Sequence, residues 1–116
     1  MNPAQPAAGT RLCALADLAD PGAEGFEFFD GDARFAGFVV RKGEAVIGYV
    51  DSCPHIGWPL ASLNGRYLTR TGEYIICSGH GAVFEIADGL CVAGPCGGHR
   101  LTPWAVRVEG EAVVVG

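Results

Sequence analysis

The residues with the clearest chemistry are two cysteine–histidine pairs. Cys53 and His55 form a Cys-x-His pair, and after 21 intervening residues Cys77 and His80 form a Cys-x-x-His pair. Thiolates and imidazoles are ligands of iron–sulfur clusters, zinc and copper, whereas hard cations prefer carboxylates. If the two loops face each other, the sulfurs can bind one iron and the ring nitrogens a second, or all four atoms can bind one tetrahedral zinc ion. The spacing alone leaves both possibilities open.

Short strands are expected to position these pairs. Apolar residues alternate with polar ones or form short runs, and turn sequences interrupt them about every 8–12 residues, which is typical of an all-β sandwich or small barrel. The 18 glycines and 7 prolines also disfavour long helices. The predicted strands are 11–15, 25–29, 36–41, 45–50, 74–77, 82–86, 90–92, 104–108 and 112–115. Each cysteine–histidine pair follows a strand and lies in a loop that contains glycine or proline.

Four dipeptides that end in glycine predict tight turns, and Asn-Gly and Asp-Gly in particular tolerate the positive φ that hairpins need. They are Lys42-Gly43, Asn64-Gly65, Asp88-Gly89 and Glu109-Gly110. A single helical turn is expected within 13–20.

The length of 116 residues suits one domain, 1–116, with a flexible Pro/Ala-rich segment at 1–9. The net charge of −5 argues against nucleic acid and anionic membranes as partners, since both attract basic surfaces. No apolar run approaches the roughly 18–20 residues that span a bilayer, and no signal peptide is recognised. Five cysteines, an odd number, favour metal ligands or reduced thiols over a closed disulfide framework. We therefore expect a cytoplasmic protein that binds neither nucleic acid nor membrane.

The two pairs and their neighbours resemble the cluster-binding boxes of Rieske 2Fe–2S proteins. The likeness lies in Cys53-Pro54-His55-x-Gly57-x-Pro59-Leu60 and in Cys77-x-x-His80-Gly81-Ala82-x-Phe84. The segment Gly89-Leu90-x-x-x-Gly94-Pro95 is similar to the proline loop that covers the cluster in that family. Together these segments place the resemblance between about residues 48 and 108, roughly half of the chain.

This resemblance implies an antiparallel Rieske-type β-sandwich with a small cluster-binding subdomain at 51–96. It also implies a 2Fe–2S cluster in which Cys53 and Cys77 bind one iron while His55 and His80 bind the other, with both imidazoles exposed. Neutral imidazoles in place of two thiolates make an added electron easier to accept, so Rieske potentials lie above the roughly −400 mV of plant-type ferredoxins. The chain would carry one electron at a time and would have no catalytic site of its own.

Departures from the family pattern indicate which branch the chain resembles. Respiratory Rieske proteins have a hydroxyl residue after the second box's His-Gly and an extra cysteine in each box. Here the corresponding positions are Ala82, Trp58 and Gly79. The sequence is thus closer to the ferredoxins of ring-hydroxylating oxygenase systems, whose partners are a reductase and a terminal oxygenase. A terminal oxygenase itself would need a mononuclear iron domain, for which this chain is too short.

Two other functions stay open at this point. The chain could be a small Rieske-like subunit of a larger oxidoreductase, or a zinc-binding interaction module. A further Cys-x-x-His sequence, Cys96 to His99, lacks the flanking residues of the second box and is interpreted as a thiol and a surface histidine. The acidic stretch 17–32 is interpreted as a solvated surface. Cys13 and Trp104 are interpreted as strand residues that pack against neighbours. Cys91 and Cys96 could form a disulfide, but a reducing compartment favours two thiols.

Overall fold

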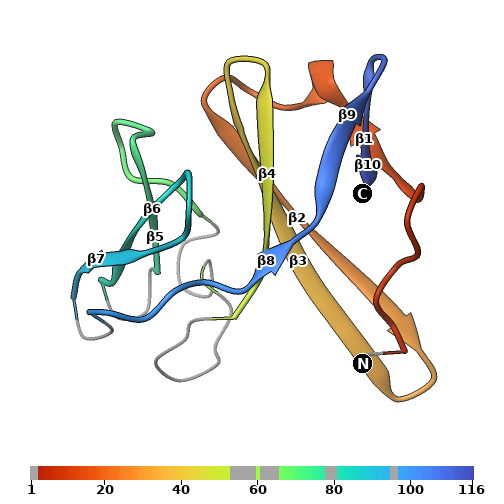
Figure 1. Cartoon of the computed structure of the whole chain (residues 1–116), viewed down its shortest axis with the longest axis horizontal. Coiled ribbons are helices and arrows are strands. Elements are labelled where there is room, and N and C mark those ends of the chain that lie inside the picture. The colour runs from red at the N-terminus through yellow and green to blue at the C-terminus, as the bar shows by residue number, and fades with distance from the viewer. Residues whose placement is uncertain (1–2, 53–59, 61–65, 78–80, 95–96) are drawn as a thin grey trace. The chain divides into compact units, whose positions relative to one another are not determined.

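The computed structural model describes residues 3–52, 60, 66–77, 81–94 and 97–116. Strands dominate these residues, with one short 3-10 turn (Figure 1). In chain order the elements are β1 (Arg11–Ala14), η1 (Leu15–Asp17), β2 (Gly22–Asp30), β3 (Ala33–Lys42), β4 (Ala45–Val50), β5 (Tyr74–Ile76), β6 (Val83–Glu85), β7 (Cys91–Ala93), β8 (Pro103–Trp104), β9 (Val106–Glu109) and β10 (Ala112–Val115). The predicted all-β class is confirmed. No helix among the described residues is long and apolar enough to cross a membrane.

The chain divides into two compact units. The first consists of Met1–Val50 and Trp104–Gly116, and the second of Asp51–Pro103. The second unit is therefore an insertion in the sequence of the first. Both predicted ligand pairs lie within the sequence of this inserted unit.

The first unit contains antiparallel sheets in the strand orders β1-β10-β9 and β2-β3-β4-β8. The long hairpin of β2 and β3 pairs Gly22 with Arg41 at one end and Asp30 with Ala33 at the other. Glycine supplies the positive φ in the turns that follow, at Gly43 (+64°) between β3 and β4 and at Gly110 (+62°) between β9 and β10. These turns lie where the sequence predicts them.

One predicted strand is wrong. The segment 104–108 is divided between β8 and β9, because the chain changes sheets at Ala105: Trp104 belongs to the strand beside β4, whereas Val106 pairs with Val115 of β10. Ala105 itself lies between the two strands, and its carbonyl accepts a hydrogen bond from the amide of Gly116 at 3.0 Å. Strands β2 and β3 also extend beyond their predicted ends, because the backbone ladder continues through glycine and charged positions that the apolar pattern does not include.

The core of the first unit forms around Trp104, which the sequence predicts only as a strand residue that packs against its neighbours. Its ring lies 5.2 Å from that of Phe35 and 6.5 and 6.4 Å from those of Phe26 and Phe28, all edge-on. Gly37 makes room for the indole, because a Cβ atom there would overlap the ring. The indole Nε1 is buried and has no hydrogen-bond partner among the described residues.

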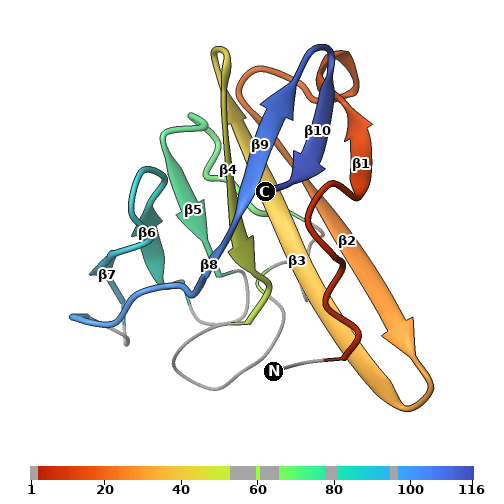
Figure 2. The same cartoon turned by 45° about the vertical axis from the view of Figure 1, so that its right-hand side comes forward.

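The second unit contains the antiparallel sheet β5-β6-β7 (Figure 2). The chain turns between β6 and β7 at Gly89, whose φ of +73° agrees with the predicted Asp88-Gly89 turn. The Asp88 carboxylate accepts a hydrogen bond from the Leu90 amide at 3.0 Å and stabilises this turn. The predicted Asn64-Gly65 turn lies outside the described residues.

Candidate functional site

Of the four predicted ligands, the structure describes Cys77. Cys53, His55 and His80 lie outside the described residues, and so do Trp58, Gly79 and Cys96. The described residues contain no group of three or more His, Cys, Asp or Glu side chains that could hold a metal ion. The assignment of all four ligands therefore stays a prediction, and the described residues around them show how the two ligand-bearing loops are anchored.

Cys77 lies immediately after β5 and is fully buried. Its amide donates to the carbonyl of Ala82, and its carbonyl accepts from the amide of Gly81, both at 2.8 Å. Gly81 has a φ of +70°, which favours glycine over residues with a Cβ atom. The backbone is thus joined on both sides of residues 78–80, so the loop that contains His80 begins and ends at fixed points.

Gly94 lies against the end of this second loop. A Cβ atom at Gly94 would be 2.7 Å from the Cα of Ala82 and 3.1 Å from the carbonyl oxygen of Gly81. Gly94 also has a φ of +92°, so both the backbone conformation and the available space require glycine. The Gly-x-x-x-x-Gly segment that ends at Gly94 therefore lies in direct contact with the residues that follow His80.

The first loop is anchored by Asp51. Its Oδ1 accepts a hydrogen bond from the amide of Leu60, and its Oδ2 accepts one from the hydroxyl of Tyr67, both at 2.8 Å. Asp51 and Leu60 flank residues 52–59, which include Cys53 and His55. One carboxylate thus joins the two ends of the first ligand loop to a tyrosine outside it.

Tyr67 also contacts the strand that leads to the second loop. Its carbonyl accepts a hydrogen bond from the amide of Ile76 at 2.8 Å, and Ile76 directly precedes Cys77. A bridge between Leu68 and Ile75 continues this antiparallel pairing.

Sequence reasoning missed Asp51 and Tyr67. The position of Asp51, between a predicted strand and a ligand loop, is a signal that could have marked it, but nothing in the sequence identifies Tyr67 as its partner.

The donor set and the described surroundings fit a sulfur- and imidazole-ligated cluster. Complete burial of Cys77 excludes bulk water from its sulfur, and exposure to solvent is one of the factors that set a cluster's potential. Ala82 is also fully buried and brings no hydroxyl group to this position. In the other Cys-x-x-His sequence, His99 is exposed and its carbonyl accepts a hydrogen bond from the amide of Cys91.

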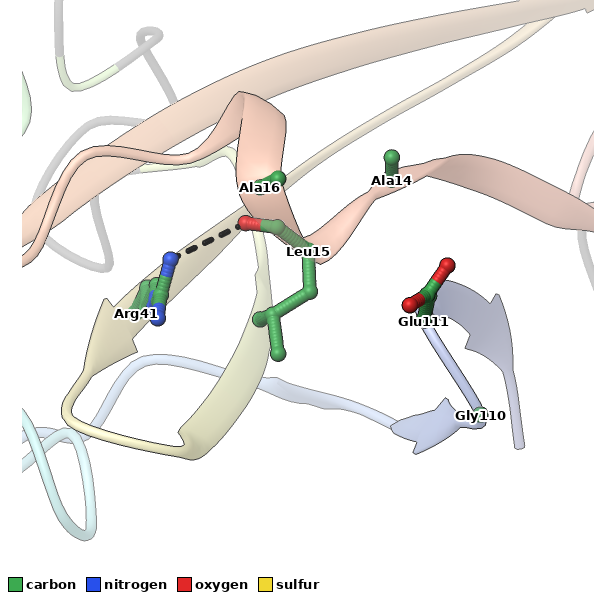
Figure 3. Close-up of a pocket in the computed structure, with 6 residues that line it drawn as sticks. All are labelled: Ala14, Leu15, Ala16, Arg41, Gly110 and Glu111. Carbon is green, nitrogen blue, oxygen red and sulfur yellow. Dashed lines mark hydrogen bonds between the residues drawn. The ribbon is translucent and has the colours of Figure 1, made fainter.

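A separate pocket of about 360 Å³ lies in the first unit, and its lining includes Leu15, Arg41 and Glu111 (Figure 3). The Arg41 guanidinium donates to the carbonyls of Leu15 at 3.1 Å, Leu18 at 3.0 Å and Gly43 at 2.9 Å. These bonds hold the η1 turn to the β3–β4 hairpin. We therefore interpret Arg41, whose guanidinium lines this pocket, as a structural residue.

The acidic residues of 17–32 are exposed, in agreement with a solvated surface. Some have local structural roles: Asp20 accepts from the amide of Gly43 at 2.8 Å, and Glu27 pairs with Arg34 at 2.9 Å. Burial, and then the charges of Asp17 and Glu24, raise the pKa of the Cys13 thiol above its ordinary value.

Comparison with known proteins identifies the family. A model of the Rieske [2Fe-2S] domain matches residues 10–115. The ferredoxin of carbazole 1,9a-dioxygenase from Nocardioides aromaticivorans IC177 is similar in structure, with a TM-score of 0.74 and 24% identity over 95% of this chain and 98% of that one. The Sphingomonas yanoikuyae B1 ferredoxin has a TM-score of 0.66 and 26% identity over 90% of this chain and 94% of that one. The terminal oxygenase of the Nocardioides enzyme has a TM-score of 0.72 and 19% identity, and the match covers 91% of this chain but 29% of the oxygenase. No curated protein matches the chain.

Proposed function

Because the chain belongs to the Rieske [2Fe-2S] domain family, we propose that it is a one-electron carrier that takes electrons from a reductase and passes them to a terminal oxygenase or another oxidoreductase. The observation that carries this proposal is the family match, which spans residues 10–115 and includes both cysteine–histidine pairs. When bound, the 2Fe–2S cluster supplies reversible one-electron transfer at a potential set by its ligands and surroundings.

In this proposal Cys53 and Cys77 bind one iron, and His55 and His80 bind the other. The chain's own contribution is to hold these side chains in place. The backbone bonds of Cys77 close the second loop, and the Asp51 carboxylate closes the first. Burial of Cys77 keeps one of the two predicted sulfur ligands away from water, and we propose that the electron leaves through the imidazoles, which the family resemblance implies are exposed.

Two observations support a ferredoxin that serves an oxygenase. The match covers 98% of the Nocardioides ferredoxin but 29% of the terminal oxygenase of the same system. A second similar structure, with 24% identity and a TM-score of 0.71, is a complex of reduced oxygenase and oxidized ferredoxin in carbazole 1,9a-dioxygenase. We further propose a cytoplasmic location, where a reducing environment keeps cysteine ligands from forming disulfides.

The first test is the metal content of anaerobically purified protein. We expect two irons and two sulfides per chain, a reddish-brown colour, and a rhombic EPR signal of low average g after reduction with dithionite. Cys77→Ser should abolish or alter this spectrum, whereas Cys96→Ser should leave it unchanged. Colourless protein with one zinc per chain would refute the proposal and favour the zinc-binding module.

The second test distinguishes a ferredoxin from a subunit. A ferredoxin should be reduced by a flavin reductase and reoxidised by a terminal oxygenase in stopped-flow mixing, with rates that rise in proportion to partner concentration. Isolation from its native cells in a fixed ratio with one large subunit would instead favour the small-subunit function.

A further inference from the structure

Asp51 uses both carboxylate oxygens within the inserted unit. Oδ1 accepts from the amide of Leu60, which is fully buried, and Oδ2 accepts from the hydroxyl of Tyr67. We call this set of two bonds the Asp51 bridge. Both distances are 2.8 Å. The amide–carboxylate distance lies within the range of charge-assisted hydrogen bonds, whereas the hydroxyl–carboxylate distance is slightly longer than the roughly 2.5–2.7 Å typical of O–H donors to a carboxylate.

The Asp51 bridge has a particular place in the sequence. Asp51 stands two residues before Cys53, and Leu60 stands five residues after His55. A bond between the two ends of a loop lowers the entropy of every residue within it. The Asp51 bridge therefore joins the two ends of the loop that contains the predicted ligands Cys53 and His55.

The Tyr67 end of the bridge extends this restriction to the second loop. The Tyr67 carbonyl holds the amide of Ile76, and the next residue is Cys77. A continuous path thus runs from Asp51 through the Tyr67 side chain and backbone to Ile76 and Cys77. This path connects the two loops through residues outside both of them.

From this path we propose that Asp51 is a positioning residue that holds the Cys53–His55 loop in register with Cys77, so that the four ligands meet one cluster. The inference rests on the proposed function. It assigns to Asp51 and Tyr67 a role in cluster retention and in the cluster's electronic environment, although neither side chain is a predicted ligand.

The variants separate the bond from the charge. Tyr67→Phe removes the hydroxyl and keeps both the ring and the Asp51 charge. Asp51→Asn removes the charge but leaves an amide oxygen that can accept from Leu60. Tyr74→Phe is the matched control, because Tyr74 lies in the same unit and its hydroxyl makes no hydrogen bond among the described residues.

The experiment measures iron release from the loaded protein to a strong Fe²⁺ chelator, well below the unfolding temperature, together with the EPR spectrum of the reduced cluster. Loss of this hydrogen bond should raise the release rate about tenfold in Tyr67→Phe, the equivalent of about 1.4 kcal/mol. Asp51→Asn should raise it by at least as much and should also raise the reduction potential, because a negative charge is removed near the cluster. Tyr74→Phe should behave like the unchanged protein.

Gly37→Ala distinguishes an effect of the bridge from a general loss of stability. This variant overpacks Trp104 in the first unit and leaves the Asp51 bridge unchanged. If this variant melts lower but releases iron at the unchanged rate, faster release in Tyr67→Phe reflects the bridge. Equal release rates in Tyr67→Phe and Tyr74→Phe, with identical EPR spectra, would overturn the inference while the unchanged protein still holds its cluster. Failure of the unchanged protein to hold a cluster would instead refute the proposed function.

Discussion

The contact between Gly94 and Ala82 allows a test of how tightly the segment 89–94 fits the second ligand loop. We predict that Gly94→Ala destabilises the inserted unit and loosens the cluster. Two costs add. The positive φ of +92° disfavours a residue with a Cβ atom by about 1–2 kcal/mol, and the new methyl group meets backbone atoms that cannot rotate away.

The structure gives the size of the second cost. The added Cβ would lie 2.7 Å from the Ala82 Cα, whereas carbon atoms prefer separations of about 3.5–4.0 Å. The two segments must therefore separate by roughly 0.8 Å or more, a displacement comparable with the overpacking that costs about 1–3 kcal/mol in protein cores. Sites that bind metals need geometry held within about 0.5 Å, so the residues next to His80 should no longer hold the cluster firmly.

Gly98→Ala is the matched control. Gly98 also has a positive φ, +84°, but its Cβ would meet nothing within 4 Å. Both variants thus carry the conformational cost, and only Gly94→Ala carries the overlap. Thermal unfolding followed by circular dichroism should show the larger decrease in Tm for Gly94→Ala, by about 4–10 °C beyond the control, with a lower iron content per chain. Equal Tm values and equal iron contents in the two variants would refute the reasoning.

Two further predictions concern the first unit. Arg41→Met removes three hydrogen bonds from a charged group to main-chain carbonyls, so it should lower the free energy of unfolding, measured by urea titration, by about 2–4 kcal/mol. Arg11→Met, at an exposed arginine, is the control. Equal urea midpoints in the two variants would contradict a structural role for Arg41. Burial and the charges of Asp17 and Glu24 raise the pKa of Cys13, so its alkylation, followed by peptide mass spectrometry, should require a higher pH than that of a cysteine in an unstructured peptide. The unfolded chain loses this proton at a lower pH than the folded chain does. The free energy of unfolding should therefore fall as the pH rises past the ordinary thiol pKa. Alkylation at the same pH as in the peptide would show that the folded chain does not protect the thiol.

The sequence predicted the strands whose apolar pattern is uninterrupted. Residues 45–50 and 112–115 form strands with the predicted bounds, because a glycine turn precedes each of them. The family was also identifiable, since metal ligands have local spacings that survive sequence divergence. The break at Ala105 was not predictable, because it depends on which of two sheets each residue joins.

Contacts distant in the sequence were the other limit. The Asp51–Tyr67 bond joins residues 16 positions apart, and no periodicity relates them. Likewise, nothing in the sequence shows that Gly94 faces Ala82. The residue types that bind metal are visible from composition and spacing, whereas the side chains that hold a ligand loop in place become visible only after folding.

The insertion of Asp51–Pro103 between β4 and the end of β8 has a consequence for divergence within the family. The inserted segment carries its own sheet and its own closing bonds. Selection on electron-transfer partners and selection on folding can act on separate stretches of one gene. A chimera that exchanges this stretch between two homologues should therefore inherit the redox behaviour of the donor.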